Sequence, residues 1–155
     1  MDSLDRKIIG ELQADGRISV TDLAERLPLS LSATSERLKR LTETGVITGF
    51  HARIDPELAG RTIEALVDVR LGPGAYSSEP AFDAPGFDAV VDAVHLTGRF
   101  DLQLRVMAAD VAELDTLLGR LKDDIGAEET NTRLVLRSLD GFPRALRPAA
   151  GDRMR

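Results

Sequence analysis

The 155-residue sequence contains no cysteine and only two histidines, His51 and His95. Without cysteine the chain forms no disulfide, no thiolate metal site and no thiolate nucleophile. Two histidines are too few for the usual histidine-based metal centre or catalytic relay. We therefore expect neither metal chemistry nor acyl transfer.

A long apolar run and a net positive charge are also missing. No uncharged apolar run reaches about 18 residues, and the amino-terminal MDSLDRK lacks the apolar core of a signal peptide. We expect a soluble globular protein in the cytoplasm. The formal net charge is −6, and because such a field repels phosphate, any contact with nucleic acid must come from a local patch.

Three short helices are predicted in the first fifty residues. Apolar spacing places the first over residues 4–14. The second begins after Ser19, at a capping-box-like sequence, and stops before Pro28. The third runs to about Thr44. The following VITGFHARID suits either a small wing-like hairpin or the start of a linker.

The pattern changes in the second part of the chain. From Thr62 the apolar residues alternate with a period of two, which predicts a strand over 62–71. Prolines interrupt the next segment, so we expect a short or broken helix there. Two strands, a helix and a strand are then predicted over 90–96, 102–107, 110–125 and 129–139. This order is that of a ferredoxin-like βαββαβ fold, with an antiparallel sheet and both helices on one face.

The second and third predicted helices have the spacing of a helix-turn-helix, whose second member lies in the major groove of DNA. Helical geometry places Leu38 and Leu41 on the buried side of the third helix. Small residues on the opposite side allow close entry into the groove, and cations there bind phosphate. The candidate DNA-contacting residues are Ser30, Ser32, Ala33, Glu36, Arg37, Lys39 and Arg40.

The alternative is that this basic run is only a solvated helix face. Glu36 and Arg40 would then form an ion pair between residues four apart. Residues 1–50 contain seven Lys or Arg against eight Asp or Glu. The basic patch is therefore local, and we expect DNA binding to require a dimer.

Several stretches resemble one protein family. The amino-terminal half of the Lrp/AsnC (leucine-responsive, feast/famine) transcription regulators is similar to LDRKIIGELQADGRISVTDLAERLPLSLSATSERLKRLTETGVITGFHARIDPELAG. That family's carboxy-terminal effector domain is similar to VHLTGRFDLQLRV and TNTRLVLRSL, in the expected order. The resemblance covers about residues 2–140. It implies a winged helix-turn-helix joined to a ferredoxin-like domain that dimerises through its sheet and often assembles into octamers.

The expected fold class is therefore α+β. The predicted parts are a winged helix-turn-helix DNA-binding domain over 1–50, a linker over 51–61, a ferredoxin-like ligand-binding and oligomerisation domain over 62–140, and a mobile tail over 141–155. We expect a sequence-specific DNA-binding transcription regulator, a homodimer or octamer, that responds to an amino acid or another small metabolite at interfaces between subunits. It is expected to be no enzyme and to use no cofactor.

The resemblance places the effector near the turn Gly98–Asp101. Backbone N–H groups of this turn and the Asp101 carboxylate then bind the two ends of the ligand. The candidate effector-binding residues are His95, Gly98, Arg99, Phe100, Asp101, Thr130 and Thr132. Each also has a structural interpretation: a left-handed turn glycine, a turn-capping carboxylate, strand packing for the threonines, and a partly buried structural histidine.

Two other functions remain open at this point. One is a ligand-sensing adaptor that regulates an enzyme by contact without binding DNA. The other is a small enzyme that uses Asp101, Arg99 and His95 around the turn.

The sequence also departs from the family pattern. Family members commonly have an acidic residue and a tyrosine where this chain has Arg99 and Phe100. The turn is then more positive and lacks a phenol, which allows a more acidic effector, or none. Pro28 replaces a usual glycine, and Glu36 replaces a usual basic residue. Glu36 either accepts a hydrogen bond from a cytosine amino group or weakens binding by repelling phosphate.

Overall fold

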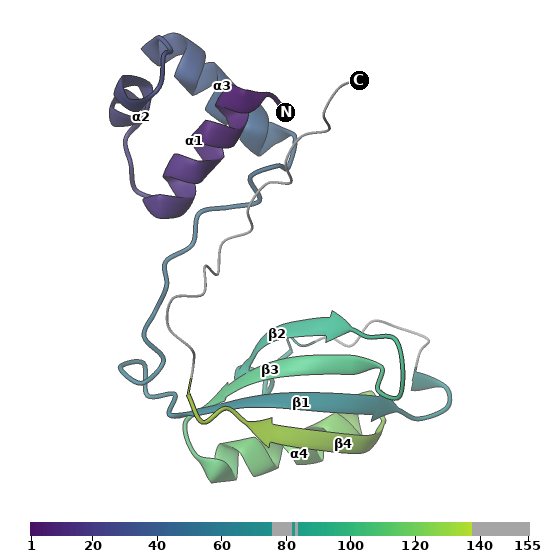
Figure 1. Ribbon diagram of the computed structural model, residues 1–155. Helices are drawn as coiled ribbons and strands as arrows, with labels where there is room; N and C mark the ends of the chain where they lie inside the picture. The colour runs from purple at the N-terminus through teal and green to yellow at the C-terminus, as the bar shows by residue number, and fades with distance from the viewer. Residues whose placement is uncertain (76–81, 83, 138–155) are drawn as a thin grey trace. The chain divides into compact units, whose positions relative to one another are not determined.

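A computed structural model describes residues 1–75, 82 and 84–137. These residues form two compact units, 1–53 and 54–137, whose boundary falls inside the predicted linker 51–61. The first unit contains three helices, and the second contains four strands and one helix; these elements are labelled in Figure 1. The predicted tail 141–155 lies outside the described residues. Within the described ranges, no helix is long and apolar enough to cross a membrane.

The first unit consists of α1 (Ser3–Ala14), α2 (Val20–Arg26) and α3 (Leu31–Glu43). Side chains cap the start of each helix, with Asp2 before α1, Ser19 before α2 and Ser30 before α3. The buried core of this unit contains Ile8, Leu23, Leu27 and Leu41. The three predicted helices are confirmed.

The segment after α3 contains no strand in residues 46–62, all of which the structure describes. The wing-like hairpin is therefore not observed, and its alternative, the start of a linker, describes this segment. Ile47 donates its backbone N–H to the Leu41 carbonyl at 2.9 Å and packs against the helical core. Val46 and Phe50 remain exposed.

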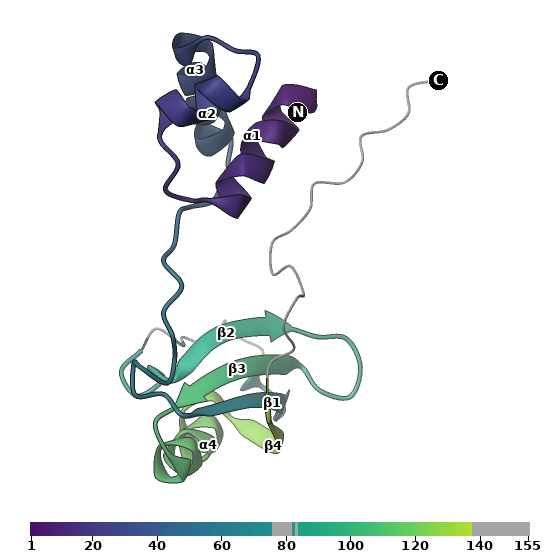
Figure 2. The same cartoon turned by 60° about the vertical axis from the view of Figure 1, so that its left-hand side comes forward.

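The second unit contains β1 (Ile63–Leu71), β2 (Val90–His95), β3 (Leu102–Ala108), α4 (Val111–Ile125) and β4 (Ala127–Leu134). The strands form one antiparallel sheet in the order β2-β3-β1-β4. Figure 2 shows α4 against one face of this sheet. The core between them includes Val67, Val69, Leu104, Val106, Leu117 and Leu121. The predicted ferredoxin-like sheet is confirmed.

Two sequence predictions need comment. The short or broken helix expected between β1 and β2 falls partly on residues 76–81 and 83, which lie outside the described residues. The neighbouring residues 82 and 84–89 form turns, in which Phe87 is buried against the sheet. The last strand was predicted to reach residue 139, but β4 ends at Leu134. Leu136 beyond it is almost fully exposed, so its apolar character does not extend the strand.

Candidate functional site

The connection between α2 and α3 spans residues 27–30 and contains no regular structure. On α3 the structure buries Thr34 and Leu41 and half-buries Leu38, which is the buried side that the spacing predicts. The Thr34 hydroxyl donates to the Ser30 carbonyl at 3.0 Å. This packing fixes which side of α3 faces outward.

The outward side of α3 holds the residues that the sequence predicts to contact DNA. Among them Ser30, Ser32, Glu36, Lys39 and Arg40 are exposed, whereas Ala33 and Arg37 are half-buried. The Ser30 hydroxyl is already the cap of the helix and accepts from the Ala33 backbone N–H at 3.3 Å. Lys39 Nζ lies 3.7 Å from Glu43 Oε1. Because both groups are exposed, this ion pair is weak and leaves the ammonium accessible to phosphate.

Two arginines of α3 are bound by carboxylates from the start of α1. Arg37 Nη1 donates to Asp2 Oδ2 at 2.7 Å and to Asp5 Oδ1 at 2.8 Å. Arg40 Nη2 donates to the same Asp5 Oδ1 at 2.9 Å. We call these four residues the α1–α3 ion cluster. The sequence patterns did not predict these contacts of Asp2 and Asp5.

The ion cluster corrects one alternative interpretation of α3. The proposed ion pair between Glu36 and Arg40 is absent among the described contacts, because Arg40 pairs with Asp5 instead. Asp5 is only 3% exposed. A carboxylate so buried needs its charge and hydrogen bonds satisfied, and the two guanidinium groups do this.

Both carboxylates of the α1–α3 ion cluster are held in the ionised form. The Asp5 backbone N–H and the Arg37 guanidinium lower the pKa of Asp2 to about 2. Burial acts to raise the pKa of Asp5, but hydrogen bonds from the Asp2 backbone N–H and from Arg37 outweigh it, and the pKa is lowered. At neutral pH the two negative and two positive charges cancel.

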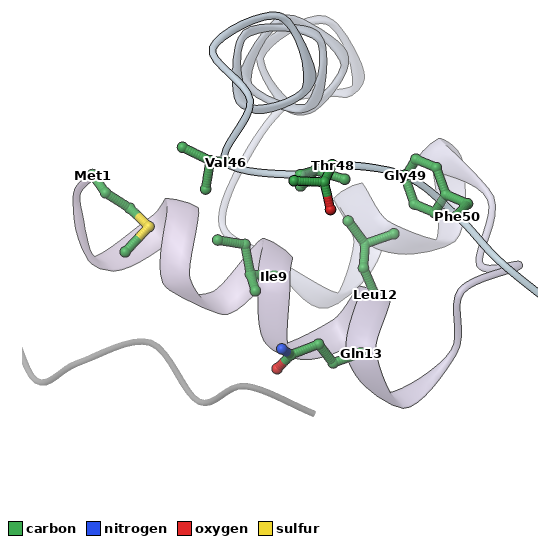
Figure 3. A pocket seen from close by; sticks show the side chains of 9 residues that line it. Met1, Ile9, Leu12, Gln13, Val46, Thr48, Gly49 and Phe50 are labelled. Carbon is green, nitrogen blue, oxygen red and sulfur yellow. The ribbon is translucent and has the colours of Figure 1, made fainter. Parts of the chain in front are cut away.

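A hollow of about 430 Å³ lies elsewhere on the first unit. Figure 3 shows Ile9 and Leu12 of α1 opposite Val46, with Phe50 at one end. Its lining is mainly apolar and includes none of the candidate DNA-contacting residues. The hollow is therefore separate from the outward side of α3.

The turn before β3 is fastened to the end of β1. Gly98 has a φ of 115°, a left-handed backbone conformation that favours glycine. The Asp101 backbone N–H donates to the Val69 carbonyl at 2.8 Å. The Asp101 carboxylate accepts from the Leu71 backbone N–H at 2.7 Å through Oδ2. One carboxylate oxygen of Asp101 is thus already used inside the chain.

The positive charge of this turn is paired within the chain. Arg99 Nη2 donates to Glu129 Oε1 on β4, and the Arg99 guanidinium lies 5.3 Å from the centroid of the Phe100 ring. Arg70 Nε approaches the other oxygen of the same Glu129 carboxylate at 3.2 Å. The extra cation that the sequence places in the turn therefore has a carboxylate partner.

The remaining effector candidates lie toward the same end of the sheet. Val69 pairs with Leu102 on one side and with Thr130 on the other, and Thr132 lies two residues along β4. Both threonines are half-buried. His95 lies opposite Leu102 but is exposed, so the prediction of a partly buried histidine is wrong. It is exposed because β2 is an edge strand of the sheet.

Sequence reasoning missed a second buried carboxylate, Asp68, in the middle of β1. It is 6% exposed and lies on the sheet face opposite the α4 core. Arg133 Nη2 donates to both of its oxygens at 2.9 and 2.8 Å. Gln103 Nε2 and Asn131 Nδ2 donate at 2.8 and 3.3 Å. Alternation along β1 predicted the face of Asp68, but it did not predict these partners.

Two family models match the chain. Residues 1–48 match the winged helix-turn-helix DNA-binding model, and residues 64–143 match the Lrp/AsnC ligand binding domain. No cluster of three or more potential metal-ligating His, Cys, Asp or Glu side chains occurs in the part of the chain that the structure describes. The matched models therefore assign DNA binding and ligand binding to different units.

Relatives match across both units. The HTH-type transcriptional regulator FL11 of Pyrococcus furiosus is 33% identical over 88% of this chain and 90% of its own length. The leucine-responsive regulatory protein of Haemophilus influenzae is 34% identical over 88% of this chain and 84% of its own length. The solved feast or famine regulatory protein from M. tuberculosis, complexed with L-methionine, is 32% identical with a TM-score of 0.81, and the match covers 95% of this chain and 99% of that one.

Proposed function

Because the chain belongs to the Lrp/AsnC family of transcription regulators, we propose that α3 enters the major groove of DNA and that the turn Gly98–Asp101 binds an amino acid effector. The protein then acts as a dimer in the cytoplasm and is not an enzyme. The observation that carries the DNA-binding part is the outward side of α3, where small side chains precede an accessible ammonium.

The proposal gives the outward side of α3 three kinds of contact with DNA. Ser32 and Ala33 are small and lie in the first turn of the helix, so they allow close approach to base edges. Lys39 binds a phosphate, which adds affinity but no sequence information. Glu36 is exposed and faces a cytosine amino group, the base-edge donor that suits a carboxylate.

The phosphate contact is tested by the salt dependence of DNA binding. Each phosphate contact contributes a slope of about −0.9 to the plot of log affinity against log salt concentration. Lys39→Ala is expected to reduce the slope by about 0.9 for each bound head. Lys122→Ala is the matched control, since Lys122 is exposed on α4 of the other unit. Equal slopes for the two variants would contradict a role for α3.

The effector part of the proposal is supported by the matched ligand-binding domain and by the L-methionine complex of the similar M. tuberculosis protein. We propose that the negative charge of the Asp101 carboxylate binds the α-amino group of an amino acid. Backbone N–H groups at Gly98 and its neighbours bind the α-carboxylate. Phe100, the threonines and His95 then surround the side chain.

Isothermal titration with L-methionine, L-leucine and L-aspartate tests this site. Asp101→Asn keeps an acceptor for the Leu71 N–H but removes the negative charge. It is expected to abolish binding of the amino acid that the unmodified protein binds, while DNA affinity without effector stays the same. Retained effector binding in Asp101→Asn would remove Asp101 from the site.

We further propose that the chain dimerises through the sheet face that bears Asp68. Four hydrogen bonds already satisfy the Asp68 carboxylate, so a second copy can cover it without leaving an unpaired charge. Leu66 and Met107 on the same face are half-buried, and Val94 on β2 is exposed. These apolar groups are the surface that a second copy would bury.

Light scattering after size exclusion tests the dimer. Leu66 lies opposite Arg105 and Arg133 on the neighbouring strands, so Leu66→Glu has cationic partners in a folded monomer. We expect this variant to be monomeric. Val111→Glu, at the exposed start of α4, is the control. It is expected to keep the oligomeric state of the unmodified protein, whether dimer or octamer. A dimeric Leu66→Glu protein would contradict the interface.

A further inference from the structure

We propose that Asp5 is a positioning residue for DNA recognition, because it withdraws Arg37 from the DNA and presents Arg40 to a phosphate. The proposal rests on α3 being the DNA-reading helix. Both arginines were candidates for DNA contact on sequence grounds, and the α1–α3 ion cluster gives them different roles.

The two arginines differ in how far they are enclosed. The Arg37 side chain is 23% exposed and donates to two carboxylates, those of Asp2 and Asp5. The Arg40 side chain is 55% exposed and donates to Asp5. A guanidinium has several N–H donors in a fixed plane, so the half-exposed Arg40 retains donors on its outer edge. Arg37 instead joins α3 to α1 through its ion pairs with Asp2 and Asp5.

A hollow beside the α1–α3 ion cluster supports the same assignment of different roles to Arg37 and Arg40. A hollow of about 380 Å³ is lined by Asp2, Asp5 and Arg40, together with Met1, Leu41, Thr44 and Val46. Arg37 does not line it. Solvent reaches the half-exposed Arg40 side chain while one of its nitrogens stays bound to Asp5. Such fixing reduces the side-chain freedom that is lost when Arg40 binds phosphate.

Asp5 also limits binding to DNA of the wrong sequence. Its charge offsets part of the positive charge of α3, and phosphate attraction is independent of sequence. A fixed Arg40 engages a phosphate in one register of α3 on the groove. An Arg40 side chain that is not fixed can bind a phosphate of the DNA backbone in any register of α3. The Asp5 carboxylate therefore favours binding to one DNA sequence and weakens the sequence-independent attraction of α3 to phosphate.

Asp5→Asn tests this role, because asparagine keeps the shape and a hydrogen-bond acceptor but removes the charge. The readout is fluorescence anisotropy of the full chain with two duplexes: the best sequence selected from a random pool and a scrambled duplex. We expect the scrambled duplex to bind more tightly to Asp5→Asn than to the unmodified protein. The preference for the selected duplex is expected to fall about tenfold, because the Arg40 contact no longer fixes the register of α3 on the duplex.

Asp2→Asn is the matched control. It changes the charge by the same amount in the same ion cluster, but Asp2 contacts Arg37 and not Arg40. Asparagine is as good a helix N-cap as aspartate, so α1 keeps its start. The Asp2→Asn protein is expected to bind the scrambled duplex more tightly while its preference changes less than twofold.

Three results would overturn the proposal. Equal losses of preference in Asp5→Asn and Asp2→Asn would mean that charge alone matters. A parallel drop in affinity for both duplexes in Asp5→Asn would mean that Asp5 only stabilises the fold. If Asp5→Asn does not fold, Arg40→Lys keeps Asp5 and the charge but loses the planar fork, and an unchanged preference in that variant would exclude Arg40. Absence of any preference in the unmodified protein would instead refute the proposed function.

Discussion

Among the residues that the structure describes, each of the two units buries one carboxylate and holds it with arginine, but the surroundings of the two carboxylates differ. Asp5, 3% exposed, joins α1 to α3 through two arginines of one helix, and Arg40 stays half-exposed. Asp68, 6% exposed, joins three strands through Gln103, Asn131 and Arg133 on an open sheet face. In the first unit, the Arg40 guanidinium stays accessible on the surface that we propose contacts DNA. In the second unit, the Asp68 carboxylate is fully hydrogen-bonded on the sheet face that we propose binds a second copy.

The largest expected loss of stability follows from removing the Asp68 carboxylate. Asp68→Ala leaves Arg133, Gln103 and Asn131 without their acceptor at the centre of the sheet. We expect the free energy of unfolding of the second unit to fall by about 3 kcal/mol. Urea unfolding followed by circular dichroism measures it, with Asp92→Ala on the exposed strand β2 as the control. A loss no larger than that of the control would show that the network does not stabilise the sheet.

The corresponding change in the first unit should be smaller. Asp5→Ala frees Arg37 and Arg40, which water can partly solvate, so a loss of about 2 kcal/mol is expected. Double-mutant cycles with Arg37→Ala and Arg40→Ala divide this loss between the partners. Coupling to the more enclosed Arg37 is expected to exceed coupling to Arg40. The reverse order would contradict the assignment of Arg37 to joining α1 and α3 and of Arg40 to binding phosphate.

The Asp101 carboxylate makes a more local contact than either buried network. Asp101→Ala removes the acceptor of the Leu71 N–H and is expected to lower the stability of the second unit by about 1 kcal/mol. Asp101→Asn, which keeps an acceptor, should unfold close to the unmodified protein. Equal destabilisation by both variants would mean that charge, and not the hydrogen bond, fastens the turn.

The smallest expected effect is the response of the first unit to acid. The pKa of Asp2 is about 2 in the folded chain, against 3.8 for a free carboxyl. A lowered folded pKa adds stability above about pH 4 and loses it as the pH falls toward 2. The pKa of Asp5 is shifted in the same direction by its contacts with Asp2 and Arg37. Thermal unfolding between pH 5 and 2 should therefore depend less on pH in Asp2→Asn than in the unmodified protein.

Local features of the fold were predictable from the sequence, whereas contacts between distant residues were not. Ser19 caps α2 within a few residues of itself, and Gly98 forms its turn locally, so short patterns predicted both. Asp5 and Arg37 are 32 positions apart, and Asp68 and Arg133 are 65 apart. Alternation and helical spacing predict the face of a residue, but they do not predict its partner on another element.

Strand order accounts for another failure of prediction. The exposure of His95 follows from the position of β2 at the sheet edge, and its short pattern is compatible with an inner strand as well. The segment VITGFHARID left a wing-like hairpin and a linker open, because a glycine followed by extended sequence occurs in both, and Gly49 lies in a segment without strands. In both cases the sequence specified the local backbone less tightly than the tertiary arrangement did.

The proposed role of the outward side of α3 is to recognise a DNA sequence. The most direct measurement is fluorescence anisotropy of the unmodified full chain, in a salt series, with the duplex selected from a random pool and with its scrambled form. If α3 reads the sequence, the selected duplex is expected to bind at least about a thousandfold more tightly than the scrambled duplex. Weak and equal binding of both duplexes at every salt concentration would contradict it.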